Sequence, residues 1–548
     1  MKHYHLKNIF LCLCLFAGMS AFAYDAQVDG IYYNFSEGNA EVTSGGYSGA
    51  VVIPASVTYN GTTYSVTSIG IDAFHGCDTL TSITIPNGVT SIGDYAFTGC
   101  KGLTSVTIPG SVTSISSYAF ASCSALSSLT LSGNLTSISD YAFYGCGALT
   151  AVTIPDKVTS IGNSAFSYCK GLTSVAIPEN VTSIGAYGFY SCSNLASVAI
   201  PESVRNIGHD AFALCRSLTS VVIPNGVGSV SSFAFYGCTS LTSVTIPETV
   251  SSIERDAFSY CCALTSVTLP QNVMSIGNYA FYNCYNLAAI NIPDRVTFIG
   301  ENAFYGCEAL ANVTIPKNLT EIGASAFAYC KGLKAVNISD LTAWCNIAFE
   351  SSSSNPLTYA HKLSLNGVEV KNLVIPEGVT SINNYAFPGC TSLTSVIIPE
   401  GVTAIGQNAF SDCTELTAVS IPEGMTNIGK EAFKNCTGLL KITCNAVQTP
   451  TVASDSFSNV DVSSVILVVP LESEEQYTNH SVWGQFMIEP VGGTFAKESI
   501  ETGIGSAKVD VRTISESYDL SGRRQNTPQH GLNLIRMSDG SIRKVLVK

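Results

Sequence analysis

Charge is scarce in this chain of 548 residues. Only 12% of the residues are Asp, Glu, Lys or Arg, whereas ordinary soluble domains carry roughly 25%. The formal net charge is −14, so the sequence has no excess of positive charge to neutralise phosphates. This balance argues against nucleic-acid binding. It also predicts a surface made of Ser, Thr, Asn, Gly and Tyr rather than of ionised side chains.

Long hydrophobic runs are missing after the first 23 residues, although 46% of the residues are hydrophobic. We therefore expect no membrane span in the mature chain. The N-terminus itself has three parts: Lys2 and Lys7, an apolar run over residues 9–19, and the small-x-small sequence Ala21-Phe22-Ala23. This order predicts a secretory signal peptide over residues 1–23, cleaved near Ala23, and hence an exported protein.

Motifs for catalysis and metal binding are absent from the sequence. It has no Cys-x-x-Cys pair for zinc, no Gly-x-Ser-x-Gly element, no phosphate-binding glycine loop and no EF-hand spacing. The histidines of the predicted mature chain lie far apart and belong to no recognisable motif. We therefore expect no enzyme activity, no cofactor and no metal.

Self-similarity dominates the rest of the sequence. The pattern of residues 89–109 recurs with a strict period of 23, and fifteen units carry a Cys with a Phe three residues before it. One coil cannot bury its apolar face alone, so a fixed period of this length predicts a solenoid whose coils stack and share one core. The repeated cysteines are expected to form a structural ladder of small buried residues. They are Cys77, Cys100, Cys123, Cys146, Cys169, Cys192, Cys215, Cys238, Cys261, Cys284, Cys307, Cys330, Cys390, Cys413 and Cys436.

Alternation within each unit predicts where the side chains point. In the strand of the unit at residues 89–109, Val106 and Ile108 point into the core and Thr107 points to solvent. Pro109 ends this strand because proline cannot donate to the next ladder. A second short strand is predicted around Ile115. The Ala-Phe-x-x-Cys segment is predicted to form a helical turn, with its Phe filling the far side of the coil.

These residues and their spacing resemble the BspA-type leucine-rich repeats of bacterial surface proteins, whose consensus contains I-G-x-x-A-F-x-x-C-x-x-L-x-S-I-x-I-P. The resemblance covers about residues 50–490. It implies a right-handed solenoid with a parallel β-sheet on its concave side and short strands and helical turns opposite. Proteins with such repeats are associated with attachment to host matrix proteins and to other cells. The resemblance therefore implies an adhesin-like protein that is secreted or held at the cell surface.

The repeats also predict how the chain is divided. An Asn-Gly pair predicts a hairpin in the N-terminal cap (Asn60-Gly61) and another in an irregular insertion (Asn366-Gly367). A functional protrusion and a plain spacer both remain open for that insertion. In the C-terminal cap, residues 465–470 are predicted to form the last strand. The predicted segments are the N-terminal cap at 24–66, regular repeats at 67–338, the insertion at 339–371, regular repeats at 372–438, a degenerate repeat and C-terminal cap at 439–492, a linker at 493–515 and a tail at 516–548.

The tail contains the sequence Tyr518-Asp-Leu-Ser-Gly-Arg523 and a basic, apolar ending from Arg543 to Lys548. Both elements resemble the C-terminal sorting domain that Bacteroidetes-type bacteria use for type IX secretion. The middle of the tail departs from that pattern, because Gly531-Leu-Asn-Leu-Ile535 stands where Gly-Ile-Tyr is more usual. The resemblance implies display at the surface or release from the cell.

Two exposed surfaces are candidates for binding. One is the outward side of the long sheet, where hydroxyl groups gather, although Thr is also simply a good strand residue. The other is a row of tyrosines two residues before the repeated Phe; these offer rigid amphipathic contact area, or they pack between coils. Further tyrosines directly follow the Phe. The candidate sheet face consists of Thr84, Thr107, Thr130, Thr153, Thr245, Thr268, Asn291 and Thr314, and the candidate tyrosine face of Tyr95, Tyr118, Tyr141, Tyr187 and Tyr279.

The sequence thus favours a protein that binds an extracellular or cell-surface partner, foremost a protein, by many similar contacts along a rigid surface. A glycan-binding surface protein and a structural component of the cell envelope remain alternatives. Cys262, Cys345 and Cys444 lie outside the ladder, and the sequence leaves open whether they form disulfides.

Overall fold

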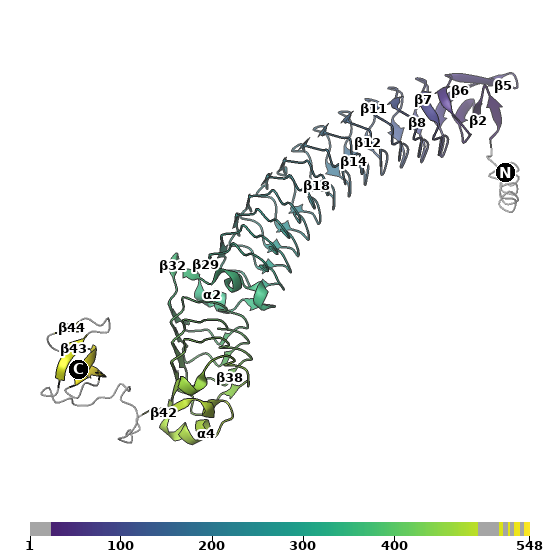
Figure 1. The fold of residues 1–548 in the computed structure, drawn as a ribbon. Coiled ribbons are helices and arrows are strands. Elements are labelled where there is room, and N and C mark those ends of the chain that lie inside the picture. Colours follow the sequence, from purple (N-terminus) through teal and green to yellow (C-terminus); the bar gives the residue numbers. More distant parts are fainter. Residues whose placement is uncertain (1–23, 492–513, 519–523, 526–530, 538–541, 548) are drawn as a thin grey trace. The chain divides into compact units, whose positions relative to one another are not determined.

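The structure is a computed structural model that describes residues 24–491, 514–518, 524–525, 531–537 and 542–547. The chain forms two compact units, Met1–Glu489 and Pro490–Lys548. The predicted signal peptide and nearly all of the predicted linker lie outside the described residues. In the first unit, coils of chain are stacked one on the next (Figure 1). This unit holds every candidate residue named above.

Two ladders of short parallel strands run through the stack. In the first ladder, β9 (Ser105–Thr107) lies in register beside β11 (Ser128–Thr130), one period further along the chain. In the second ladder, β8 (Ser91–Ile92) lies in the same way beside β10 (Ser114–Ile115). The predicted solenoid of 23-residue coils, with two strands in each regular coil, is therefore confirmed.

The remaining strands take the same positions in their coils, and each ladder consists of several shorter sheets. The first ladder also contains β4 (Gly49–Val52), β7 (Leu80–Thr84), β13 (Ala151–Thr153), β15 (Ser174–Ala176), β17 (Ser197–Ala199), β19 (Ser220–Val222), β21 (Ser243–Thr245), β23 (Ser266–Thr268), β25 (Ala289–Asn291), β27 (Asn312–Ile315), β29 (Ala335–Ile338), β31 (Leu363–Leu365), β33 (Asn372–Val374), β35 (Ser395–Ile397), β37 (Ala418–Ile421), β39 (Lys441–Cys444) and β41 (Ile466–Pro470). The second ladder also contains β6 (Thr62–Ile69), β12 (Ser137–Ile138), β14 (Ser160–Ile161), β16 (Ser183–Ile184), β18 (Asn206–Ile207), β20 (Ser229–Val230), β22 (Ser252–Ile253), β24 (Ser275–Ile276), β26 (Phe298–Ile299), β28 (Glu321–Ile322), β30 (Ala348–Phe349), β34 (Ser381–Ile382), β36 (Ala404–Ile405), β38 (Asn427–Ile428) and β40 (Thr451–Val452).

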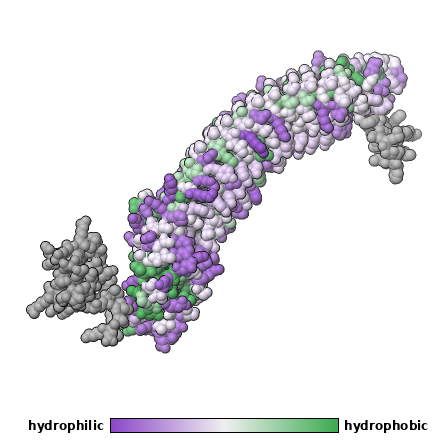
Figure 2. All heavy atoms as spheres, viewed as in Figure 1, coloured by the Kyte–Doolittle hydropathy of each residue, from purple (hydrophilic) through white to green (hydrophobic). Residues whose placement is uncertain are grey.

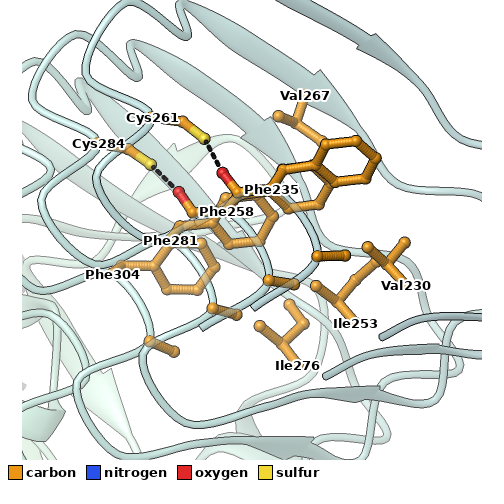
Figure 3. Packing of buried hydrophobic residues seen from close by; sticks show 14 of the residues in the cluster. Val230, Phe235, Ile253, Phe258, Cys261, Val267, Ile276, Phe281, Cys284 and Phe304 are labelled. Carbon is orange, nitrogen blue, oxygen red and sulfur yellow. Dashed lines mark hydrogen bonds between the residues drawn. The ribbon is translucent and has the colours of Figure 1, made fainter. Parts of the chain in front are cut away.

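Alternation along these strands builds the core as the sequence predicts. Val106 and Ile108 are each 2% exposed, whereas Thr107 between them is exposed. The carbonyl of Pro109 then accepts a hydrogen bond from the Val112 N–H, which turns the chain toward the second strand. On the far side of the coils, the repeated Phe rings stack in a buried column that is interrupted at the insertion; Figure 3 shows part of it. Burying so many apolar side chains, each worth roughly 1.5–3 kcal/mol, is what holds the coils together.

The Ala-Phe-x-x-Cys segment is a series of hydrogen-bonded turns rather than a run of α-helix. The Thr98 N–H donates to the Tyr95 carbonyl, and the Cys100 N–H donates to the Phe97 carbonyl. Each bond joins residues three positions apart and so closes a four-residue turn. Between them, the Phe97 N–H donates to the Ala119 carbonyl of the next coil at 2.7 Å. Tyr95 has a φ of 56°, a left-handed conformation that interrupts helix. This side of the coils therefore forms a third backbone ladder.

The N-terminal end of the stack is covered by antiparallel strands. β5 (Ser56–Tyr59) and β6 form the predicted hairpin, and Asn60 and Gly61 between them have φ values of 52° and 76°, as a type I′ turn requires. The strand β4 already belongs to the first ladder, so the first coil begins inside the predicted cap. The other strands of this end are β1 (Ala26–Val28), β2 (Ile31–Ser36) and β3 (Asn39–Val42).

The C-terminal end is closed by short helices and by one more strand than predicted. Phe457 stacks on Phe433 at 5.4 Å and so continues the ring column. The prediction that residues 465–470 form the last strand is wrong, because β42 (Met487–Val491) extends the sheet beyond β41. The helical elements here are η2 (Val462–Ser464), η3 (Leu471–Ser473), α4 (Glu474–Thr478) and η4 (Trp483–Gln485).

The insertion at residues 339–371 interrupts both strand ladders. The sheets of the preceding coils end at β30 and at β32 (Val368–Glu369), and new sheets begin at β33 and β34. The predicted hairpin at Asn366-Gly367 is present, since β31 and β32 pair antiparallel on either side of it. The other elements of the insertion are α2 (Leu341–Cys345), η1 (Ser352–Ser354) and α3 (Leu357–Ala360).

Side chains of the insertion complete the coil that follows it. Trp344 Nε1 donates to the Ala386 carbonyl at 2.9 Å, and Asn355 Nδ2 donates to the Tyr385 carbonyl at 2.7 Å. His361 Nδ1 lies 3.0 Å from the Gly389 carbonyl. In a regular coil, the carbonyl equivalent to that of Ala386 accepts a backbone N–H of the preceding coil, as the Ala96 carbonyl does from Phe74. The insertion is therefore an internal joint between two arrays of coils.

The second unit contains one antiparallel sheet with the strand order β44-β43-β45-β46. The predicted linker overlaps the start of this sheet by two residues, because β43 begins at Ile514. The four strands are β43 (Ile514–Tyr518), β44 (Arg524–Gln525), β45 (Gly531–Met537) and β46 (Ile542–Val547).

Candidate functional site

The candidate sheet face is the outward side of the first ladder. All eight residues predicted for it are exposed, because each stands at an outward position of its strand. Neighbours such as Thr107 and Thr130 lie directly beside each other across the ladder. Midway along the array, Ala176, Ala199 and Val222 take the same position, and Val222 is 56% exposed. The face is therefore uncharged, with hydroxyl groups interrupted by a short apolar stretch.

The five residues of the candidate tyrosine face do not form one row. Tyr95, Tyr118 and Tyr141 form a stack, with ring centroids 4.8 and 4.3 Å apart and interplanar angles of 14° and 5°. In this stack each ring covers the face of its neighbour. Tyr187 instead meets the His209 ring edge to face at 4.9 Å, and the guanidinium of Arg255 lies 5.3 Å from the centre of Tyr279. The stacked part thus offers ring edges and hydroxyl groups rather than open ring faces.

A second aromatic row joins tyrosines from two repeat positions. Tyr144 and Tyr190 directly follow their Phe, whereas Tyr168 between them stands two residues after its Phe, with a left-handed φ of 60°. Tyr168 meets each of the other two edge to face at 5.3 Å. In the sequence, the position of Tyr168 is marked by a Tyr immediately before the ladder Cys. The repeat pattern alone does not predict that this Tyr contacts the tyrosines that directly follow the Phe. The row resumes further along the array with Tyr236, Tyr260, Tyr282, Tyr305 and Tyr329.

A hollow of about 450 Å³ lies where this row is interrupted. In the interrupted coil, Ala213 and Leu214 occupy the two positions that carry tyrosine elsewhere. Tyr190 and Tyr236, on either side of the gap, both line the hollow. Its other walls come from aromatic rings and charged side chains of the coils that follow. The hollow lies on the side of the coils formed by the Ala-Phe-x-x-Cys turns, here called the turn side.

Two recessed carboxylates line the hollow. The side chains of Asp210 and Asp256 are only 14% and 10% exposed. His209 Nδ1 lies 3.2 Å from a carboxylate oxygen of Asp210, and Arg255 Nε lies 3.2 Å from one of Asp256. Burial raises the pKa of both carboxyl groups above their usual range, and the neighbouring His209 and Arg255 oppose that shift.

The cysteine ladder is buried in the core and makes hydrogen bonds there. The thiol of Cys261 donates to the Phe235 carbonyl at 3.3 Å, and that of Cys284 to the Phe258 carbonyl at 3.1 Å (Figure 3). Thirteen of the fifteen ladder cysteines make this bond to the Phe of the preceding coil. Burial raises the pKa of Cys169 to about 12. Such thiols stay protonated at neutral pH and are poor nucleophiles.

The cysteines outside the ladder are also free thiols. Cys345 and Cys444 are buried, and the Cys444 sulfur lies 3.2 Å from the Tyr477 hydroxyl. Cys262 is partly exposed. Across the described part of the chain, no three His, Cys, Asp or Glu side chains are grouped so that they could hold a metal ion. Nor does any helix among the described residues have the length and hydropathy to cross a membrane.

The sequence matches a family model described as the BspA type leucine-rich repeat region. The matches cover residues 56–172, 136–261, 228–356 and 358–478. No curated protein matches the chain.

Solved structures of bacterial repeat proteins are also similar to this chain, at low TM-scores. A leucine-rich repeat protein from Bacteroides ovatus is 26% identical, with 85% of this chain and 100% of that chain covered and a TM-score of 0.42. A leucine-rich cell surface protein from Faecalibacterium prausnitzii is 28% identical, with 78% and 95% covered and a TM-score of 0.42. The pneumococcal vaccine antigen PcpA is 16% identical, with 86% and 100% covered and a TM-score of 0.31.

Proposed function

The chain belongs to the BspA-type leucine-rich repeat family, and on that premise we propose that it is a non-enzymatic, extracellular or cell-surface protein that binds another macromolecule. The partner we propose is a protein of a host or of another cell. The contact surface is an extended face of the coils rather than a single pocket. The predicted signal peptide and sorting-like tail support a location outside the cell.

The observation that carries this proposal is the register of the first ladder. Within each sheet of this ladder, a coil presents its outward residue directly beside that of the next, as Thr107 lies beside Thr130. Strand neighbours in such a ladder are about 4.8 Å apart, so the face repeats one small contact along a rigid sheet. Many weak, similar contacts then add up to useful affinity.

The composition of the surface fits a protein partner. In the view of Figure 2, most of the first unit's surface is pale, with strongly hydrophilic and hydrophobic residues scattered over it. Since only 12% of the residues in the chain are charged, a partner that covers the surface has few ionised side chains to dehydrate. It also repels nucleic acid, which is no partner in this proposal.

The test is a binding measurement with the purified full chain on immobilised extracellular-matrix proteins and on whole cells. We expect saturable binding that weakens gradually as whole 23-residue units are removed from the array between residues 67 and 338. Removing units from the array at 372–438 is the matched comparison, and it locates the contact face. Complete loss of binding on a single change such as Thr130→Ala would contradict the extended face.

A structural role in the cell envelope makes a different prediction. In that case the purified chain should assemble with itself into ordered particles, and it should ignore matrix proteins and cells. Ordered self-assembly without any foreign ligand would therefore replace the proposal made here.

A further inference from the structure

The hollow beside Asp210 and Asp256 is a departure from the repeat. Both aspartates stand two residues before their Phe, the position that Tyr occupies in the coil before Asp210 and in the coil after Asp256. An aspartate side chain is much shorter than a tyrosine ring. Two such replacements, two coils apart, leave the space on the turn side that forms the hollow of about 450 Å³.

The backbone does not require a carboxylate at this position. Asp210 and Asp256 have φ values of 56° and 54°, and Ser164 and Tyr187 adopt 52° and 57° at the same place in their coils. Recessing a carboxylate from water is costly unless hydrogen bonds replace the lost hydration. Both aspartates are thus recessed at a position where a serine or a tyrosine adopts the same backbone.

Two carboxylates and one guanidinium, that of Arg255, line the hollow. Asp256 is paired with Arg255, and Asp210 lies beside His209. A cationic ligand would compete with these partners for the carboxylates, and an anionic ligand would be repelled by two of them. The arrangement instead suits a neutral ligand that both donates and accepts hydrogen bonds, because the two carboxylates are acceptors and the Arg255 guanidinium is a donor.

The walls of the hollow are aromatic. Tyr260 meets Tyr236 and Tyr282 edge to face at 5.6 and 5.4 Å. These rings supply apolar contact area, and their hydroxyl groups add donors at the rim. Apolar walls with a few fixed polar groups are typical of small-ligand sites. A ligand with vicinal hydroxyl groups and apolar C–H faces matches both parts, and a pyranose ring has both.

We propose that the hollow lined by Asp210, Asp256 and Tyr236 is a binding site for one neutral sugar unit of a glycan. This site goes beyond the protein-binding function proposed above, since it lies on the turn side of the coils and not on the outward face of the first ladder. The sugar hydroxyls donate to the two carboxylates and accept from Arg255, while the tyrosine rings contact the sugar ring.

The test uses the purified full chain and saturation-transfer NMR with glucose, galactose, mannose, N-acetylglucosamine and their short oligomers. Choline and glucuronic acid serve as the cationic and anionic probes. We expect saturable binding of at least one neutral sugar. Asp210→Asn and Asp256→Asn should each weaken it by about tenfold or more, because a hydrogen bond to a charged group is lost. Asparagine also tolerates the left-handed backbone, so both variants should fold.

Asp72→Asn is the matched control. Asp72 stands at the same repeat position with a φ of 56°, but its side chain is 47% exposed, and it lies outside the hollow. This variant should bind sugar as the unchanged chain does. Tyr236→Leu, which removes one wall, should weaken binding, and the melting temperature of each variant reports whether it is folded.

Several outcomes would overturn the assignment. If choline or glucuronic acid binds and no neutral sugar does, the proposed class of ligand is wrong. If no compound of the panel binds, the hollow is not a binding site for a sugar. Sugar binding that survives both aspartate changes would place the sugar elsewhere on the chain. If the aspartate variants lose sugar binding but still bind matrix proteins, the site is supported and the proposed function is unaffected. If the unchanged chain binds sugar but no matrix protein or cell, only the proposed function fails.

Discussion

At the scale of single residues, the ladder cysteine does more than fill space. The Phe235 carbonyl, for example, accepts both the N–H of Cys238 in its own coil and the thiol of Cys261 in the next. A serine at this position would put a more strongly solvated hydroxyl into the core, and an alanine would leave a gap. A thiol combines small apolar volume with a weak donor, which suits a carbonyl that already has one partner.

The buried thiols predict a loss of stability at alkaline pH. Burial raises the pKa of Cys169 and Cys238 from 9.0 to about 12. Below pH 9 the thiols are protonated in the folded and the unfolded chain, so their contribution to stability is fully present. Between pH 9 and about 12 only the unfolded chain releases these protons, so the free energy of unfolding falls as pH rises.

Melting temperatures measured from neutral pH upward would check this expectation. The double variant Cys169→Ser/Cys238→Ser should lose less of its melting temperature over the alkaline range than the unchanged chain. Tyrosines titrate in the same range but are identical in both proteins. An equally steep decline in the two proteins would show that these thiols do not contribute.

At the scale of elements, the joint in the insertion is held by side-chain hydrogen bonds, whereas regular coils are held together by backbone hydrogen bonds. Asn355 is fully buried; its Nδ2 donates to the carbonyls of Tyr385 and Ala386, and its Oδ1 accepts from the Leu357 N–H. One amide group thus makes two of the side-chain hydrogen bonds to the first coil of the second array. The insertion needs such groups because both strand ladders stop there.

Asn355→Ala should therefore destabilise the joint. We expect the free energy of unfolding of the second array to fall by about 1–3 kcal/mol, the usual cost of leaving buried hydrogen-bonding groups without a partner. Tryptophan fluorescence during denaturation is the measurement, because the two tryptophans lie in the insertion (Trp344) and in the C-terminal cap (Trp483).

Asn134→Ala is the control for that variant. Asn134 Nδ2 also donates to a carbonyl, that of Gly110 at 2.8 Å, but the side chain is exposed, so water replaces the lost bond. Its effect should be small. Equal effects of the two changes would mean that the joint is no more sensitive than an ordinary coil.

The sequence predicts the elements that depend on hydrophobic period and misses those that depend on backbone conformation. Alternation was enough to place Val106 and Ile108 in the core, and an Asn-Gly pair was enough for each hairpin. The second aromatic row was not predictable in the same way, because Tyr168 reaches its neighbours through a left-handed residue that no hydrophobic pattern marks. The hollow was missed for a similar reason: Asp210 and Asp256 are 46 positions apart and become neighbours across a single coil only when the register is known.

At the scale of the whole molecule, stability is expected to be a sum over coils and the interfaces between them. Removing residues 92–114 places Ile115 directly after Ser91, as Ile92 was, and deletes one complete period. This shortened chain should fold, keep its circular-dichroism spectrum and lose only a few degrees of melting temperature.

Removing residues 92–103 instead should prevent correct stacking, because about half a period is lost and inward positions no longer face inward. Comparing the two deletions by circular dichroism and thermal melting distinguishes the effect of losing one coil from the effect of losing the register between coils. If both deletions unfold the chain, the additive description fails.

The constant register of the ladders also has a consequence for how such a protein changes over generations. Since the regular coils share one length and one register, one coil can take the place of another. The encoding gene is a tandem run of near-copies, each a whole number of codons. Unequal exchange between these copies adds or removes complete coils without shifting the reading frame. Length is therefore the property that this architecture leaves free for selection to adjust, one coil at a time.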